Sequence, residues 1–407
     1  MARRILIILL FVLNILAMSG CWDRTELEDL GVVNAVGIEH GSKERIRTVV
    51  QTLNTAAQSK TTGGRGVEFE KGYRNSVIED TTFAGTINRM TVLTATKRNF
   101  SHNTLFIISE DFARKEGVRD LLDFLERDPQ IRLDAWIIIG RGSLVNMLDV
   151  PGRISGSPGQ RINDIIKFHN ESFSYAPLKL EEFIRLLDSK SSQPYTAVVE
   201  IQPNASVPTD KGHGILNGNV PEPLNNIVMD GTALFKKDKM VGWLNDTESR
   251  GLLWLRGDAR QGTLTFPMLE KTPKEITTYL LKSKIRLQPE IKEGQVYMTI
   301  KVEVESYLLD NQAGINPADP KEFGKAESAQ GQEVKRQIKA ALKKAQEQYQ
   351  VDVFGFGEAV HRKYPHEWKQ MEKDWPNLFP AVPVKIQVKS SIQHTSLTIG
   401  APESAQR

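Results

Sequence analysis

The sequence is poor in cysteine, because Cys21 is the only one among 407 residues. A chain with one cysteine forms no internal disulfide and offers no thiol pair for redox chemistry or metal binding. An excess of charge is also missing, since 53 Lys and Arg residues face 50 Asp and Glu residues, a formal charge of +3. This balance gives no electrostatic basis for nucleic-acid binding. Because no internal disulfide can form, the stability of the fold must depend on its hydrophobic cores.

Long hydrophobic runs are absent as well. The apolar run from Ile5 to Leu16 is roughly a dozen residues, short of the ~20 that cross a bilayer as a helix. It follows the basic pair Arg3 and Arg4 and precedes Gly20 and Cys21, which is the layout of a bacterial lipoprotein signal. We expect residues 1–20 to be a signal peptide that is cleaved between Gly20 and Cys21.

Lipid on Cys21 would make the membrane itself a partner, because two or three acyl chains hold a protein almost permanently at a bilayer. The alternative is an ordinary secreted protein with one buried cysteine. We favour the anchor because of the position of Cys21 directly after Gly20. Removing residues 1–20 takes away only Arg3 and Arg4 among the charged residues, so the mature chain stays close to neutral.

The length exceeds what one ordinary core accommodates, so we expect several domains. A loop rich in proline and glycine, residues 203–223, suggests the first boundary. The predicted division is residues 21–202 as an N-terminal α/β domain, 203–262 as a middle domain with a β-hairpin, and 263–407 as a C-terminal α+β domain. The predicted fold class is α+β, elongated, with mixed sheets and flanking helices.

The N-terminal region shows two apolar runs, residues 104–108 and 135–139, on either side of a helical pattern at 118–125. Such runs predict strands buried on both faces and paired in parallel through a crossover. Charged residues lie at the ends of these runs. An enzyme hypothesis would place a site there, but capping and ion pairing explain them better because no histidine or nucleophile is near. These charged residues are Glu110, Asp111, Arg132 and Asp134.

The C-terminal region predicts a helix over 333–349, with one apolar face and a dense cationic face. Such a face suits anionic headgroups or an acidic partner, and a solvated helix surface is the simpler alternative. Exposed aromatic residues near Trp368 and Trp375 are the other candidates for a docking surface. The proposed partner-binding residues are Lys335, Arg336, Lys339, Lys343, Lys344, Trp368 and Trp375.

A metal site is not expected. His361, His366 and Glu367 do not have the His-Glu-x-x-His spacing, and Pro365 interrupts any helix that would join them. The glycines at 63–66 lack the spacing of a phosphate-binding loop. We therefore expect no cofactor.

Three blocks of sequence, in order, resemble the Ger(x)C family, the C subunits of spore nutrient germinant receptors. The first begins at Cys21 with Cys-Trp-Asp-Arg-Thr-Glu-Leu, and the second covers 106–117 with 127–134. The third includes Gly-Thr-Ala-Leu-Phe at 231–235 and Asp-Val-Phe-Gly-Phe-Gly at 352–357. The resemblance implies an elongated α+β protein of three domains, lipidated at Cys21, on the outer face of the inner spore membrane. It also implies a nutrient-sensing complex with an A-type and a B-type membrane subunit.

Two other functions are compatible with a lipid-anchored protein. A solute-binding protein of a transporter needs two similar doubly wound lobes, and the antiparallel pattern expected for the C-terminal lobe argues against it. An envelope hydrolase needs a nucleophile with its base, or metal ligands, and the sequence shows neither. We therefore expect a non-catalytic receptor subunit.

Overall fold

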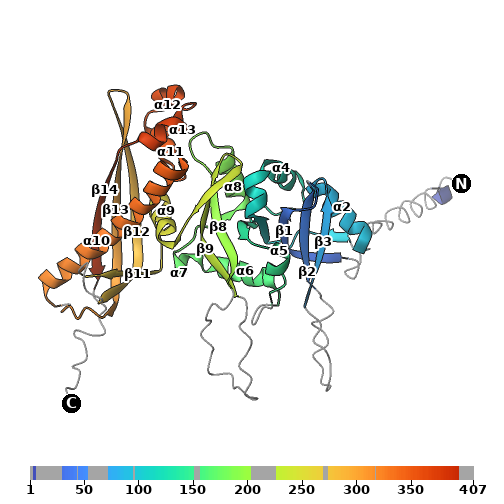
Figure 1. Ribbon diagram of the computed structural model, residues 1–407, viewed down its shortest axis with the longest axis horizontal. Helices are drawn as coiled ribbons and strands as arrows, with labels where there is room; N and C mark the ends of the chain where they lie inside the picture. The colour runs from blue at the N-terminus through green and yellow to red at the C-terminus, as the bar shows by residue number, and fades with distance from the viewer. Residues whose placement is uncertain are drawn as a thin grey trace, which may run out of the picture.

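The protein is elongated, with its N-terminal region at one end and its C-terminal region at the other (Figure 1). The computed structural model describes residues 3–5, 30–43, 45–53, 72–94, 97–150, 156–202, 226–268, 274–316 and 318–393. These residues form two sheets with helices packed on them, which confirms the predicted mixture of strands and flanking helices.

The strands fall into a first sheet, β1 to β10, and a second, β11 to β14. They are β1 (Leu30–His40), β2 (Ile46–Leu53), β3 (Tyr73–Asp80), β4 (Lys97–Asn99), β5 (Leu105–Ser109), β6 (Trp136–Arg141), β7 (Leu178–Lys179), β8 (Tyr195–Gln202), β9 (Asn226–Lys236), β10 (Lys239–Leu244), β11 (Thr263–Pro267), β12 (Glu275–Lys292), β13 (Gln295–Asn311) and β14 (Val384–Gln393).

The helices cover the faces of these sheets and connect their strands. They are α2 (Phe83–Thr94), α3 (Glu110–Lys115), α4 (Arg119–Arg127), α5 (Leu144–Met147), α6 (Pro158–Lys167), α7 (His169–Ser172), α8 (Leu180–Leu187), α9 (Asp246–Arg256), α10 (Pro320–Leu342), the π-helix η3 (Lys343–Tyr349), α11 (Phe356–Lys363), α12 (Pro365–Met371), α13 (Trp375–Leu378) and the 3₁₀ turn η4 (Phe379–Ala381).

The first sheet is built around parallel strands in the order β8-β6-β5-β1. Side chains of β5 alternate between two cores: Phe106 and Ile108 face one, while Leu105 and Ile107 face the other. The first core is covered by α2, α3, α4 and α8, and the second by α5 and α6. Strands buried on both faces and paired in parallel are what the apolar runs predicted.

The hairpin of β9 and β10 forms as predicted, with Lys237 and Asp238 at its tip. It extends the first sheet, because β9 pairs antiparallel with β8. The strands that we assigned to a middle domain of residues 203–262 therefore continue the sheet of the N-terminal region. The helix α9 also lies within residues 203–262, and it packs against α10 of the C-terminal region.

The second sheet has the order β11-β12-β13-β14. We expected an antiparallel C-terminal lobe, and this is wrong for one pair: β13 and β14 run parallel, with Ile300 opposite Ile386. The parallel pairing arises because α10 to η4 intervene between the two strands and return the chain to the starting end. Side chains alternate along β13, with Met298, Ile300 and Val302 buried.

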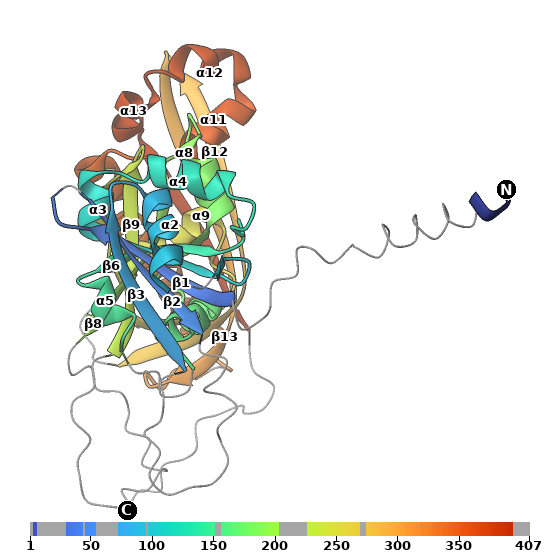
Figure 2. The same ribbon diagram turned by 90° about the vertical axis from the view of Figure 1, so that its right-hand side faces the viewer.

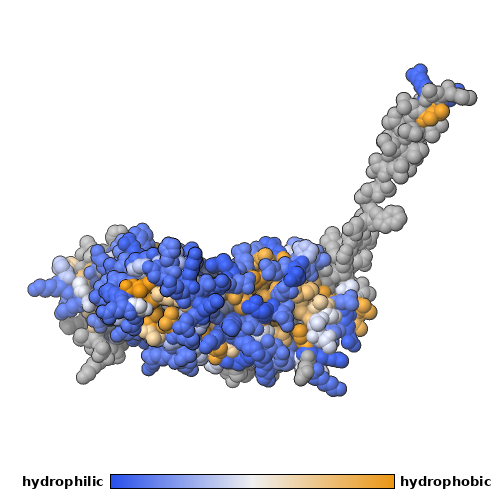
Figure 3. All heavy atoms as spheres, turned by 90° about the horizontal axis from the view of Figure 1, so that it is seen from above, coloured by the Kyte–Doolittle hydropathy of each residue, from blue (hydrophilic) through white to orange (hydrophobic). Residues whose placement is uncertain are grey.

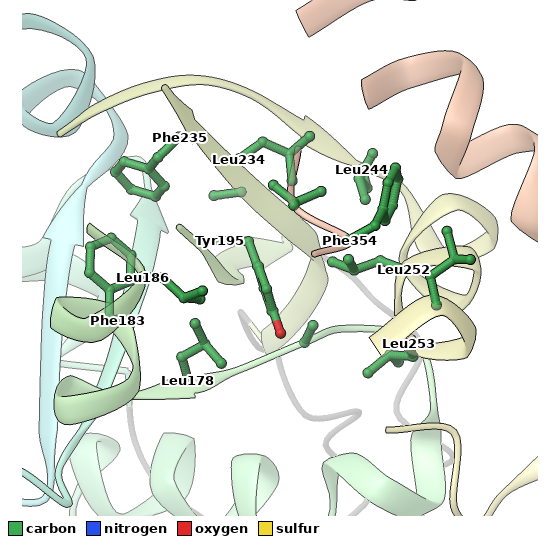
Figure 4. Close-up of a cluster of buried hydrophobic side chains, with 14 of the residues drawn as sticks. Leu178, Phe183, Leu186, Tyr195, Leu234, Phe235, Leu244, Leu252, Leu253 and Phe354 are labelled. Atoms are coloured by element: carbon green, nitrogen blue, oxygen red, sulfur yellow. The ribbon is translucent and has the colours of Figure 1, made fainter. Parts of the chain in front are cut away.

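The two regions share one hydrophobic junction (Figure 4). Phe354 of the C-terminal region lies beside Leu252 of α9 and near Tyr195 of β8, and all three side chains are buried. Between α9 and α10, the Trp254 indole Nε1 donates a 2.8 Å hydrogen bond to Oε1 of Gln337. The continuous core fixes the position of α10 relative to the first sheet.

Candidate partner-binding surface

The predicted basic face lies on α10 and its continuation η3. The helix begins after Asp319, whose side chain accepts from the Lys321 backbone N–H, and Pro320 occupies its first turn. Val334, Ile338 and Leu342 are buried against the core, so the predicted apolar face is confirmed. Helical periodicity then directs the intervening lysines outward.

The five cationic residues do not all present free charge. Arg336 makes a two-bond ion pair with Glu333, at 2.7 Å for each N–O contact, and this bond raises the pKa of Arg336. Lys344 is half-buried, and its Nζ lies 4.0 Å from Oε1 of Glu248. Lys335, Lys339 and Lys343 are exposed and form no ion pair with any residue that the structure describes. The available charge is therefore that of three lysines.

The two tryptophans are not on the surface, so the expectation of exposed aromatic residues there is wrong. Trp368 and Trp375 are only 1% and 2% exposed. They pack edge to face with a ring-centroid distance of 5.3 Å, and Trp375 also contacts Phe379. An indole can be buried when its N–H has an acceptor, and the Trp375 indole has one.

The partner of Trp375 is Asp352, a buried carboxylate that sequence reasoning missed. One oxygen, Oδ2, accepts from the Trp375 indole at 3.0 Å and from the Gly357 backbone at 2.7 Å. The other accepts from the backbone N–H groups of Phe354, Gly355 and Phe356. Burial raises the pKa of the Asp352 carboxyl, and these donors oppose that effect. The acidic residue directly before Phe-Gly-Phe-Gly was the available signal.

Two glycines, Gly355 and Gly357, make this loop possible. Gly355 has φ of +81°, in the left-handed region that glycine adopts readily. A Cβ at Gly357 would lie 2.7 Å from the carbonyl oxygen of Ser191. The backbone N–H of Gln193 also donates to the Asp352 carbonyl at 2.8 Å. The loop therefore fastens the C-terminal region to the segment before β8.

The charged residues considered for an enzyme site do not converge. Glu110 contacts Arg114, Asp111 contacts Lys115, and Arg132 contacts Asp134, all through local ion pairs. This arrangement is the ion pairing that we favoured. Because each carboxylate is engaged with a neighbouring cation, the group offers no base poised beside a nucleophile.

A second ionic cluster, which the sequence did not indicate, forms where β6, β8 and β9 meet. Arg141 contacts Glu200 at 2.9 Å, Asp230 at 2.5 Å and Glu110 at 3.5 Å. Its guanidinium also lies 4.3 Å from the centre of the Trp243 ring. Open α/β sheets commonly bind ligands beyond the carboxyl ends of parallel strands. Here Arg141 and the carboxylates that it contacts occupy that position, and their ion pairs link β6, β8 and β9.

Residues of the described ranges contain no group of three His, Cys, Asp or Glu side chains placed to hold a metal ion. His361 stacks on Trp368 with ring centroids 5.7 Å apart. This histidine therefore has a packing contact with the aromatic cluster.

The proposed lipidation residue Cys21 and the cleavage residue Gly20 lie outside the described residues. Within the part of the chain that is described, no helix combines the length and the apolar character needed to span a bilayer.

Comparisons with known proteins match both halves of the chain. A family model described as the spore germination protein N-terminal domain matches residues 23–201. A second, described as spore germination B3/GerAC like, C-terminal, matches residues 230–396. Together they cover both described sheets in chain order.

Individual relatives agree with these family models. The chain is 25% identical to spore germination protein KC of Bacillus subtilis, covering 98% of this chain and 97% of the relative. It is 27% identical to spore germination protein YndF of the same organism, covering 96% and 97%. A crystal structure of the GerBC protein superposes with a TM-score of 0.56 at 16% identity, over 88% of this chain and 96% of that one. This likeness supports the fold.

Proposed function

Because the chain belongs to the Ger(x)C family of spore germination proteins, we propose that it is the C subunit of a spore nutrient germinant receptor. The observation that carries the proposal is the match of two spore germination family models to successive parts of the chain. Coverage of 98% of this chain by the KC relative supports a shared role for the whole protein.

The proposed anchor is lipid on Cys21 after cleavage behind Gly20. It rests on the basic and apolar segments that precede the only cysteine. The corresponding location is the outer face of the inner spore membrane. There the subunit would act beside A-type and B-type membrane subunits. The exposed lysines Lys335, Lys339 and Lys343 are the proposed docking residues, because they hold no ion pair within the described chain.

The proposed role is non-catalytic. The carboxylates that follow β5 are Glu110 and Asp111, and they are engaged with Arg114, Arg141 and Lys115. A solute-binding protein with two similar doubly wound lobes would need two comparable sheets. Among the described residues, the first sheet has ten strands around a parallel centre and the second has four, mostly antiparallel. This difference between the two sheets favours a germinant-receptor subunit over a solute-binding protein.

The experiment is germination of spores that lack this gene, followed as loss of optical density. Nutrients are supplied separately, and one further trigger bypasses nutrient receptors. We expect failure with one set of nutrients and a normal response to the bypass. Reintroducing the gene should restore the lost response. Unchanged responses to every nutrient, in spores that also lack related C subunits, would contradict the proposal.

A further inference from the structure

The last turn of α2 exposes apolar side chains that the fold does not use. Val92 is 77% exposed and Leu93 67% exposed, the two highest values among the large hydrophobic residues described. The opposite face of the same helix packs against the protein, with Phe83 and Met90 buried in the first core. The exposed pair is therefore a surface feature of a well-packed helix.

A cation shares this surface. Arg89 stands three and four residues before Val92 and Leu93, so all three lie on one helical face. The Arg89 side chain is 56% exposed, and its guanidinium stays 3.9 Å from Asp80. Apolar side chains beside basic ones are typical of surfaces that rest in the interfacial region of a membrane.

The position of α2 close to the start of the chain indicates that this surface faces the membrane. β4 follows α2 directly and pairs in parallel with the beginning of β1, where Leu30 lies opposite Lys97. The nine peptide steps from Cys21 to Leu30 span at most ~32 Å. A lipid on Cys21 would thus keep this end of the protein close to the bilayer. Figures 1 and 2 show α2 at that end, beside β1 and β3.

We propose that Arg89, Val92 and Leu93 form a second membrane contact, which rests on the surface of an anionic phospholipid bilayer. The inference rests on the proposed lipid anchor at Cys21. Tethering makes the second contact intramolecular, so a small patch suffices to orient the protein. Figure 3 shows a mainly hydrophilic surface with hydrophobic atoms at this end as one of several patches. The contact would fix which end of the elongated body faces the lipid.

The test uses the lipidated full chain in vesicles of phosphatidylcholine with phosphatidylglycerol. Lipid consumes the only native thiol, so Leu93→Cys introduces a single site for an environment-sensitive fluorophore. The matched control is Leu309→Cys, which labels a 52% exposed leucine of β13 at the other end. We expect a blue-shifted emission, quenched at least twofold by lipid-borne quenchers, for the label at position 93. The control label should stay in water.

Equal quenching at positions 93 and 309 would overturn the proposal, and so would an aqueous signal at both. In the latter case Val92 and Leu93 would be free for a protein partner. Vesicles of phosphatidylcholine alone separate the apolar from the electrostatic contribution. An unchanged signal there would overturn the requirement for anionic lipid. Flotation of the same samples reports the Cys21 anchor independently, so loss of the second contact and loss of the anchor are distinguishable.

Discussion

Trp375 donates its indole N–H to Asp352 across 23 residues of sequence, at 3.0 Å. The same carboxylate accepts from the backbone of residues 354–357. One side chain therefore shapes the loop before α11 and fixes the aromatic cluster on which α12 and α13 pack. We infer that Asp352 is the main determinant of local order in this part of the C-terminal region.

Asp352→Ala should destabilise the protein strongly. The substitution leaves several buried donors without an acceptor, and each unpaired buried group costs about 1–3 kcal/mol. We expect the free energy of unfolding to fall by about 3 kcal/mol or more, measured by urea denaturation of lipid-free protein. Asp374→Ala is the control, because Asp374 is exposed. Its loss should stay below about 1 kcal/mol, and equal losses for the two variants would contradict our interpretation.

Gly251→Ala should disturb the packing of α9 against α10 and destabilise the protein. A Cβ at Gly251 would lie 2.7 Å from that of Ala341 and would also clash with the Gln337 backbone. Overpacking of this kind costs about 1–3 kcal/mol. Gly324→Ala, on α10, is the matched control because an added Cβ there meets nothing within 4 Å. That variant should gain about 0.5–1 kcal/mol. Thermal denaturation distinguishes the two, and a stabilised Gly251→Ala would refute the close packing.

Glu79→Gln should have a pH-dependent effect on stability. The Ser42 hydroxyl, together with Arg47, lowers the pKa of Glu79 from 4.5 to about 2. In the unfolded chain the carboxyl takes up its proton near 4.5, so its contribution is complete above that pH and disappears as pH falls through 2. The difference in unfolding free energy between wild type and variant should therefore shrink between these limits. A difference independent of pH would exclude this role for Glu79.

Neutralising the exposed lysines of α10 and η3 should weaken receptor assembly. Three lost charges at about 0.5 kcal/mol each correspond to roughly tenfold lower affinity. The readout is recovery of the A-type and B-type subunits with this protein from spore membranes. The lysines are changed to glutamine at Lys335, Lys339 and Lys343, and in the control at the exposed positions Lys282, Lys284 and Lys301. Equal recovery from the two triple variants would argue against docking through α10.

Cys21→Ala should give a folded protein that no longer associates with membranes through lipid. Both described cores are built from residues Val33 onward, so we expect them to form in the variant. Fractionation of spore extracts should move the protein from the membrane to the soluble fraction and reduce the germination response. A fully soluble variant with normal germination would show that the anchor is dispensable.

Local patterns in the sequence predicted elements well where one face of an element is buried. The alternation along β13 and the apolar stripe of Val334, Ile338 and Leu342 each follow a fixed period, so their orientation could be read directly. The resemblance blocks at 106–117 and 352–357 fall on the unit of β5 and α3 and on the loop that Asp352 orders.

Long-range relationships could not be read in this way. Whether β14 runs parallel or antiparallel to β13 depends on the path of the intervening helices, and no local period records it. The burial of Trp368 and Trp375 depends on partners such as Asp352 and Phe379 that meet them only in the fold. The ion pairs of Arg141 likewise join residues 59 and 89 positions away.

The location of β1 in the sheet has a mechanical consequence. The strand is held on one side by β2 and on the other by β4 and β5, so both of its edges are hydrogen-bonded. A force applied along its axis at the Leu30 end loads these hydrogen bonds in shear. The bonds then share the force, so they do not break one after another. If lipid on Cys21 anchors the chain as proposed, tension from the membrane would spread into the centre of the first sheet.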